Sequence, residues 1–114
     1  MNKTISFLKT IADKNRLLIL YLLKQQTLCV CDIQKVIPLT QGALSIQLKS
    51  LTTVGLLSYF KQGKWVFYKL SDEIDATQHL ILSQLFKDIE PDTDVLKMMS
   101  QLTISKVCKD HTGE

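Results

Sequence analysis

The chain has 114 residues, of which 46% are hydrophobic, and its 14 Lys and Arg against 11 Asp and Glu leave a net charge of +3. This length fits one domain over residues 1–114, and no apolar run reaches the roughly 18 residues of a membrane span. The first residues lack the long apolar region of a signal peptide, so we expect a cytoplasmic protein without a membrane partner. Three cysteines in that compartment are expected to be reduced, and their odd number argues against a disulfide framework.

The charge is unevenly distributed along the chain. Residues 1–70 hold ten Lys and Arg against two acids, or +8, and residues 71–114 hold four Lys against nine acids, or −5, which sum to +3. A basic half suits a surface that binds a polyanion, although chance segregation of surface charge is the plainer alternative. The distribution favours DNA contact by residues 1–70.

Hydrophobic spacing and turn residues predict eight elements. Asp13 is the expected N-cap of the second helix, Thr40 that of the fourth, and Gly55 the C-cap of the fourth. Ser71 or Asp72 is the expected cap of the fifth helix. The expected helices cover residues 3–12, 14–24, 30–37, 41–54, 72–90 and 93–107, and the expected strands of a hairpin cover 56–61 and 65–70, joined at 62–64.

This order, α-α-α-α-β-β-α-α, is mainly helical and predicts a winged helix-turn-helix. In that fold the fourth helix enters the major groove of DNA and the hairpin forms the wing. The whole chain is then a single winged-helix domain for DNA binding and dimerisation.

One face of the fourth helix is expected to read DNA. Leu44, Leu48 and Leu51 form an apolar stripe, which leaves the opposite face for the bases. A glutamine can pair with an adenine edge, an isoleucine can touch a thymine methyl and a lysine can hold a phosphate. A solvated helix face and an exposed hairpin are the plainer alternative. The candidate DNA-binding residues are Thr40, Gln41, Gly42, Ser45, Ile46, Gln47 and Lys49 on the helix and Lys61, Gln62 and Lys64 on the wing.

These segments resemble the ArsR/SmtB family of metal- and metalloid-responsive repressors. The matching segments are residues 12–17, 28–33, 44–51, 55–57 and 61–70. Their most specific part, Leu-Cys-Val-Cys-Asp at residues 28–32, resembles the arsenic-responsive members, in which the cysteines that open the third helix bind As(III) or Sb(III). The resemblance implies a homodimer built on the first and the late helices. It also implies repression without effector and release of operator DNA when the effector binds.

Three departures from the family pattern bear on the effector. Gln34 stands where the arsenic repressors commonly carry a third cysteine, and residues 46–47 stand where His or Arg is usual. Residues 72–74 lack the His of the zinc site on the late helix, so we expect no zinc site there. Cadmium and lead sensors carry the same cysteine string but add earlier cysteines, and this chain has none before Cys29.

Two cysteines make an incomplete site for As(III), which binds best to three thiolates. In a continuous helix, side chains two residues apart point about 200° apart, so Cys29 and Cys31 grip one atom only where the helix start is non-helical or unwinds. The third ligand stays open between Cys108, a small thiol and water. The plainer alternative is that Cys29 and Cys31 are two small buried hydrophobes.

Other classes of function compete with a metalloid-responsive repressor. A repressor of the same fold could sense thiol oxidation or reactive sulfur, and a winged helix could serve only as a protein-interaction module without salt-dependent DNA binding. A thiol enzyme is disfavoured, because Cys-x-Cys is not the Cys-x-x-Cys of thioredoxin-like proteins and no other catalytic constellation is visible. We therefore predict no enzymatic activity and no organic cofactor.

Overall fold

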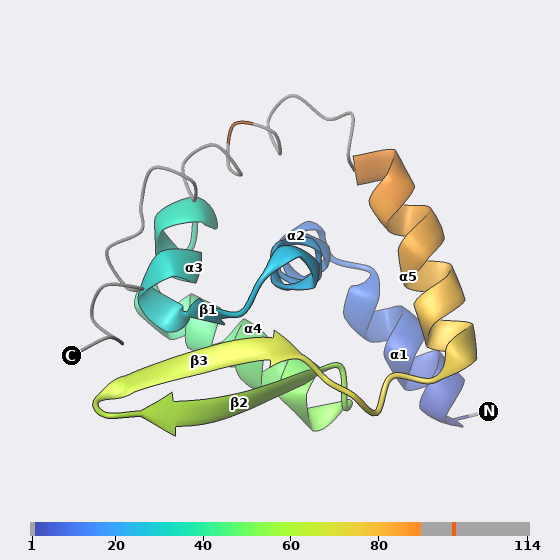
Figure 1. The fold of residues 1–114 in the computed structure, drawn as a ribbon. Coiled ribbons are helices and arrows are strands. Elements are labelled where there is room, and N and C mark those ends of the chain that lie inside the picture. The colour runs from blue at the N-terminus through green and yellow to red at the C-terminus, as the bar shows by residue number, and fades with distance from the viewer. Residues whose placement is uncertain (1, 90–96, 98–114) are drawn as a thin grey trace.

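The computed structural model describes residues 2–89 and 97 (Figure 1). The predicted helix over 93–107 and Cys108 lie outside the described residues, Lys97 excepted. Helices α3 and α4 form the helix-turn-helix pair and the β2–β3 hairpin forms the wing, which confirms the predicted fold (Figure 1). The elements are α1 (Asn2–Ile11), α2 (Lys14–Gln25), β1 (Leu28–Cys29), α3 (Val30–Val36), α4 (Gln41–Thr53), β2 (Leu57–Gln62), β3 (Trp65–Leu70) and α5 (Ala76–Ile89).

Polar caps begin helices α2 and α4 at the predicted residues. The Asp13 carboxylate accepts a hydrogen bond from the Arg16 backbone N–H at 3.0 Å, and the Thr40 hydroxyl accepts one from the Ala43 backbone N–H at 3.2 Å. Each cap satisfies a backbone donor that has no partner within its own helix. The start of α4, which carries the candidate reading residues, is therefore fixed locally by its own sequence.

The end of α4 is set by Gly55, as predicted. Its φ of 84° lies in the left-handed region, where a side chain would be strained. The backbone N–H groups of Gly55 and Leu56 donate to the carbonyls of Thr52 and Leu51, at 3.0 Å in both cases. This C-terminal motif satisfies the last carbonyls of the helix and turns the chain into β2.

The sheet has a strand that the sequence did not predict. Besides the β2–β3 hairpin, the two-residue β1 pairs antiparallel with β3, with Leu28 opposite Tyr68 and Cys29 opposite Phe67. The strand order is β1-β3-β2. The start of α3 is thus hydrogen-bonded to the wing. The hairpin turns at two residues rather than the predicted three, with Gly63 at a φ of 64°.

Helix α5 begins later than predicted. The expected caps, Ser71 and Asp72, precede a turn, and the helix starts at Ala76. The Asp75 carboxylate accepts from the Gln78 backbone N–H at 2.8 Å, while the Gln78 side-chain oxygen accepts from the Asp75 backbone N–H at 3.1 Å. This reciprocal pair is a capping box, which satisfies two donors where a single cap satisfies one.

We expect the Asp75 cap to be pH-dependent. The Gln78 backbone N–H, and with it the Lys3 ammonium 3.2 Å away, holds the pKa of Asp75 below its ordinary 3.8. The folded state therefore binds the proton more weakly than the unfolded chain. The stabilisation is present above about pH 4 and is lost as pH falls through the lowered pKa. Thermal unfolding should show Asp75→Asn less stable than wild type at neutral pH, with the gap closing towards pH about 2. Asp72→Asn, at an exposed carboxylate, is the matched control, and a gap that persists in acid would contradict this cause.

The core lies between the helices and the inner face of the sheet. The predicted stripe on α4 is buried, since Leu44, Leu48 and Leu51 are 0%, 2% and 0% exposed. They pack in one cluster with residues of α1, α2, α3 and α5. None of the helices within residues 2–89 is both long and apolar enough to cross a lipid bilayer. Burial of the stripe presents the opposite face of α4 to the outside.

Candidate nucleic-acid interface and thiol site

The outer face of α4 carries most of the predicted DNA-binding residues. Gly42, Ser45 and Lys49 are exposed there, and Ile46 is 69% exposed. Thr40 and Gln41, also exposed, stand at the N-terminal end of the helix, where a recognition helix first meets the bases. An isoleucine this exposed adds little to folding, whereas a thymine methyl would cover it.

Gln47 is the exception on this helix. It is half-buried, and its side-chain oxygen accepts a hydrogen bond from Nε of Arg16 on α2. Arg16 also donates from Nη1 to the carbonyl of Thr10, near the end of α1, at 3.2 Å. These bonds tie the middle of α4 to the first two helices. The sequence held the signal, because Gln47 is three residues after Leu44 and four before Leu51, on the edge of the buried stripe.

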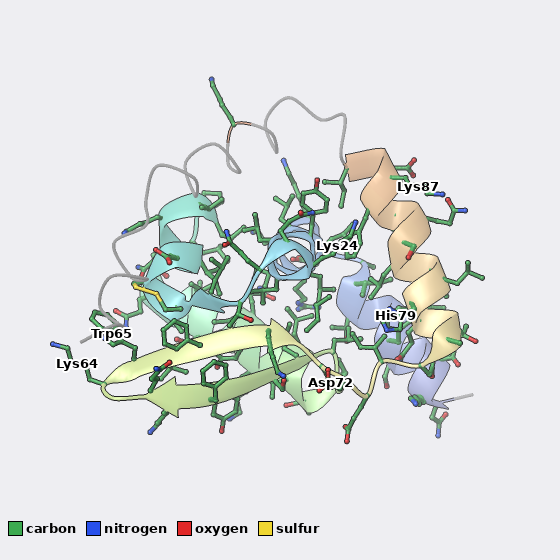
Figure 2. The ribbon with its side chains drawn as sticks, in the orientation of Figure 1. Lys24, Lys64, Trp65, Asp72, His79 and Lys87 are labelled. Atoms are coloured by element: carbon green, nitrogen blue, oxygen red, sulfur yellow. A yellow bond between two sulfur atoms is a disulfide. The ribbon has the colours of Figure 1, made fainter. Side chains whose placement is uncertain are left out.

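The wing presents the remaining predicted residues at its tip. Lys61, Gln62 and Lys64 are exposed around the turn of the hairpin. The ammonium of Lys64 lies 5.5 Å from the centroid of the Trp65 ring, and Figure 2 shows Lys64 at the far end of the hairpin. Two lysines on a projecting hairpin have the charge and the reach to contact a phosphate backbone beside the groove that α4 would enter.

The two cysteines converge at the junction of β1 and α3. Cys29 ends the strand and is the N-cap of the helix, with extended φ and ψ of −77° and 161°, and Cys31 lies in the first turn. Because the backbone is extended at Cys29, the two side chains meet, with Cα atoms 5.4 Å apart. The predicted requirement for a non-helical start is therefore met. The expectation of reduced thiols is wrong for this structure, which joins Cys29 and Cys31 in a disulfide (Figure 2).

Asp32 completes a cluster of three donor groups. The sulfurs of Cys29 and Cys31 and a carboxylate oxygen of Asp32 all lie within 4.8 Å of one another. The sequence analysis did not single out Asp32, which is 3% exposed and has the Lys35 ammonium 3.6 Å from Oδ1. Thiolates suit soft ions and a carboxylate suits harder ones. The two sulfurs are thus the donors that match a thiophilic metalloid.

A pocket of about 400 Å³ opens beside this cluster and joins it to the predicted reading surface. Its walls come from the start of α3, the first turns of α4 and the base of the wing. Three of the predicted DNA-binding residues, Gln41, Ser45 and Lys64, line it together with both cysteines. The linear sequence gave no sign of this meeting. A change at the sulfurs therefore has a direct path to the residues that would touch DNA.

Sequence comparison identifies relatives of this chain. Residues 13–59 match the family model of bacterial regulatory proteins described as the arsR family. The arsenical resistance operon repressor of Escherichia coli K12 is 39% identical over 84 residues, which cover 73% of this chain and 72% of that protein. A homologue of the cadmium resistance transcriptional regulatory protein CadC from Staphylococcus aureus is 38% identical over 66 residues, or 57% of this chain and 54% of that protein.

Solved structures share the fold. HlyU from Vibrio cholerae N16961 has a TM-score of 0.67 and 31% identity, over 75% of this chain and 90% of that one. A homodimeric winged helix-turn-helix DNA-binding domain from Mycobacterium bovis, a possible ArsR-family regulator, has a TM-score of 0.60 at 22% identity, over 78% of this chain and 76% of that one. The second likeness bears on the fold alone, and it supports the winged helix-turn-helix architecture.

Proposed function

This chain belongs to the arsR family of bacterial regulatory proteins, and we propose that it is a homodimeric repressor released from its operator by a thiophilic metalloid. It is a winged-helix transcriptional regulator and not an enzyme. In the proposal, α4 enters the major groove, the β2–β3 wing holds the neighbouring backbone, and Cys29 and Cys31 bind As(III) or Sb(III).

The homodimer is supported by apolar side chains on α1 and α5. Ile5 and Leu8 on α1 are 43% and 41% exposed, and Leu80 on α5 is 66% exposed. Both helices lie at the end of the molecule opposite the tip of the wing (Figure 1). A second copy seated there would cover these side chains and leave α4 and the wing of each protomer open to DNA. Two-fold symmetry would then present two reading helices to a palindromic site.

The observation that carries the proposal is the pocket shared by the cysteines and the predicted reading residues. Gln41 and Ser45 from α4 and Lys64 from the wing line the same pocket as the two sulfurs. A ligand bound to both sulfurs meets groups that DNA also needs. Effector and DNA then bind with unequal affinity to the same arrangement of side chains, which is the requirement for release.

The proposed effector follows from the donor set. Two thiolates favour soft ions, and the relatives are named for resistance to arsenicals and to cadmium. We place As(III) and Sb(III) first, because the chain lacks earlier cysteines that would complete a thiolate site for cadmium. A second candidate is a repressor that responds to thiol oxidation, which the disulfide between Cys29 and Cys31 favours.

The test is release of an operator selected by the protein from a random DNA pool. Fluorescence anisotropy of that DNA is followed while the reduced protein is titrated with As(III), Sb(III), Cd(II), Zn(II) or a peroxide. We expect the two metalloids to release the DNA at the lowest concentrations and Zn(II) to leave it bound. Release by peroxide with none by any ion would replace the proposal by the redox-responsive candidate.

Binding of the reading surface to phosphates predicts a salt effect. Replacing Lys64 by Gln removes two contacts per dimer, which should make the slope of log affinity against log salt shallower by about 1.8. Lys87→Gln, on α5 and far from the wing in Figure 2, is the matched control and should leave the slope unchanged. Equal slopes for wild type and Lys64→Gln would remove Lys64 from the interface.

A further inference from the structure

The thiol site leaves one valence of arsenic unfilled. As(III) forms three bonds, and Cys29 and Cys31 supply two sulfurs. The other side chains near these sulfurs offer oxygen or nitrogen: Asp32, with the Lys35 ammonium 3.6 Å from it, and the amide of Gln34 in the pocket. Neither is a soft donor. Within residues 2–89, the protein therefore provides a dithiol rather than a trithiol site.

Space is available on the open side of the dithiol. The pocket of about 400 Å³ starts at both cysteines and is walled by Trp65, Val66 and Tyr68 of β3. These three side chains are half-buried, and together they make one side of the pocket apolar and aromatic. Small-molecule sites combine such apolar walls with a few polar groups, here Gln34 and Gln41. The pocket is far larger than a single hydroxyl on arsenic would need.

We propose that this site takes a trivalent arsenic that brings its own third substituent, a mono-organic arsenic(III), whose organic group fills the pocket. The inference rests on the proposed function, in which Cys29 and Cys31 hold the effector. It goes further by naming the class of ligand, R–As(III) with R an aryl or alkyl group. Inorganic arsenite fills the same two positions but leaves the apolar wall of β3 uncovered.

The binding step balances without oxidation or reduction of arsenic. The disulfide is first opened by a phosphine or thiol reductant, which supplies two electrons while water or thiol supplies two protons. Each thiol then replaces one hydroxyl of R–As(OH)₂, forming an As–S bond while the thiol proton leaves with the hydroxide as water. The As–C bond stays intact. The product is a ring closed through Cys29, Val30 and Cys31, with R directed into the pocket.

The substituent gives this ligand a stronger effect on DNA binding than arsenite has. Gln41 and Ser45 line the pocket that R would occupy, and both are exposed on α4. Burial of one aromatic ring against the apolar wall supplies about tenfold in affinity. We therefore expect release of DNA in the order phenyl, then methyl, then inorganic arsenic(III).

The experiment compares phenylarsine oxide, methylarsonous acid and arsenite on the selected operator. The protein carries Cys108→Ser, so that Cys29 and Cys31 are its only thiols, and it is reduced with a phosphine that is then removed. The midpoint for phenylarsine oxide should lie at least about tenfold below that for arsenite. Mass spectrometry should show one R–As per chain, with two hydrogens lost.

Gln34→Cys is the diagnostic variant and Gln34→Ser its matched control. A third thiol at this exposed position should lower the arsenite midpoint by about tenfold or more and narrow the gap to phenylarsine oxide, whereas serine should change neither. If arsenite releases DNA as readily as phenylarsine oxide from the Cys108→Ser protein, the inference fails and the proposed function stands. If no arsenical binds or releases DNA, the proposed function fails as well.

Discussion

A chain in which Cys29 and Cys31 are both serine is expected to bind its operator as tightly as wild type and to stay bound when arsenite is added. Effectors of this kind change DNA affinity by about 5- to 150-fold, which corresponds to about 1–3 kcal/mol of coupling. The double substitution removes both As–S bonds, so the whole of that change should disappear. Anisotropy of labelled operator, with and without arsenite, measures it.

Two controls separate loss of the trigger from loss of the fold. Cys29 is 1% exposed and packs with Phe67, so its replacement by serine puts a hydroxyl into an apolar contact. Thermal unfolding must therefore show that the double variant is folded at the assay temperature. Cys108→Ser, the matched change at the third cysteine, should keep the full response. A full response in the folded double variant would move the effector site away from Cys29 and Cys31.

The second large effect is expected in the core side of α4. Leu48 is 2% exposed, and its replacement by alanine should cost about 2–5 kcal/mol of unfolding free energy because a cavity is left. Domains of this size have only about 5–15 kcal/mol in total. Urea unfolding followed by circular dichroism measures the loss.

Ile46, two residues earlier on the same helix, is the matched control. Since it is 69% exposed, Ile46→Ala should change stability by less than about 0.5 kcal/mol. Its effect should fall on DNA affinity instead, where loss of a base contact costs about 1–3 kcal/mol. A stability loss equal to that of Leu48→Ala, or unchanged DNA affinity, would contradict the assignment of the two faces of α4.

The helical part of the fold was predictable because its signals are local. The leucine stripe of α4, the caps Asp13 and Thr40 and the terminating Gly55 all act within one or two turns of their own positions. The start of α5 was mistaken although its signal was also local. Asp75 and Gln78 stand three residues apart, the spacing of a capping box, and this pair outweighs the isolated Ser71 and Asp72.

The features missed were those that depend on contacts between distant segments. Strand β1 has two residues, too few to show alternation, and it exists because β3, almost forty residues later, pairs with it. That pairing holds Cys29 extended and brings the two sulfurs together, which the helical interpretation of residues 30–37 did not foresee as the resting arrangement. The meeting of the cysteines with Gln41, Ser45 and Lys64 in one pocket is likewise set by packing.

The measurement that tests the central claim most directly is arsenite release of operator DNA from the reduced Cys108→Ser protein. In that chain, Cys29 and Cys31 are the only thiols, so any response must pass through them. The account predicts that DNA is released as arsenite is added, and that arsenic binds at one atom per chain. Operator that stays fully bound while the protein remains reduced and folded would contradict it.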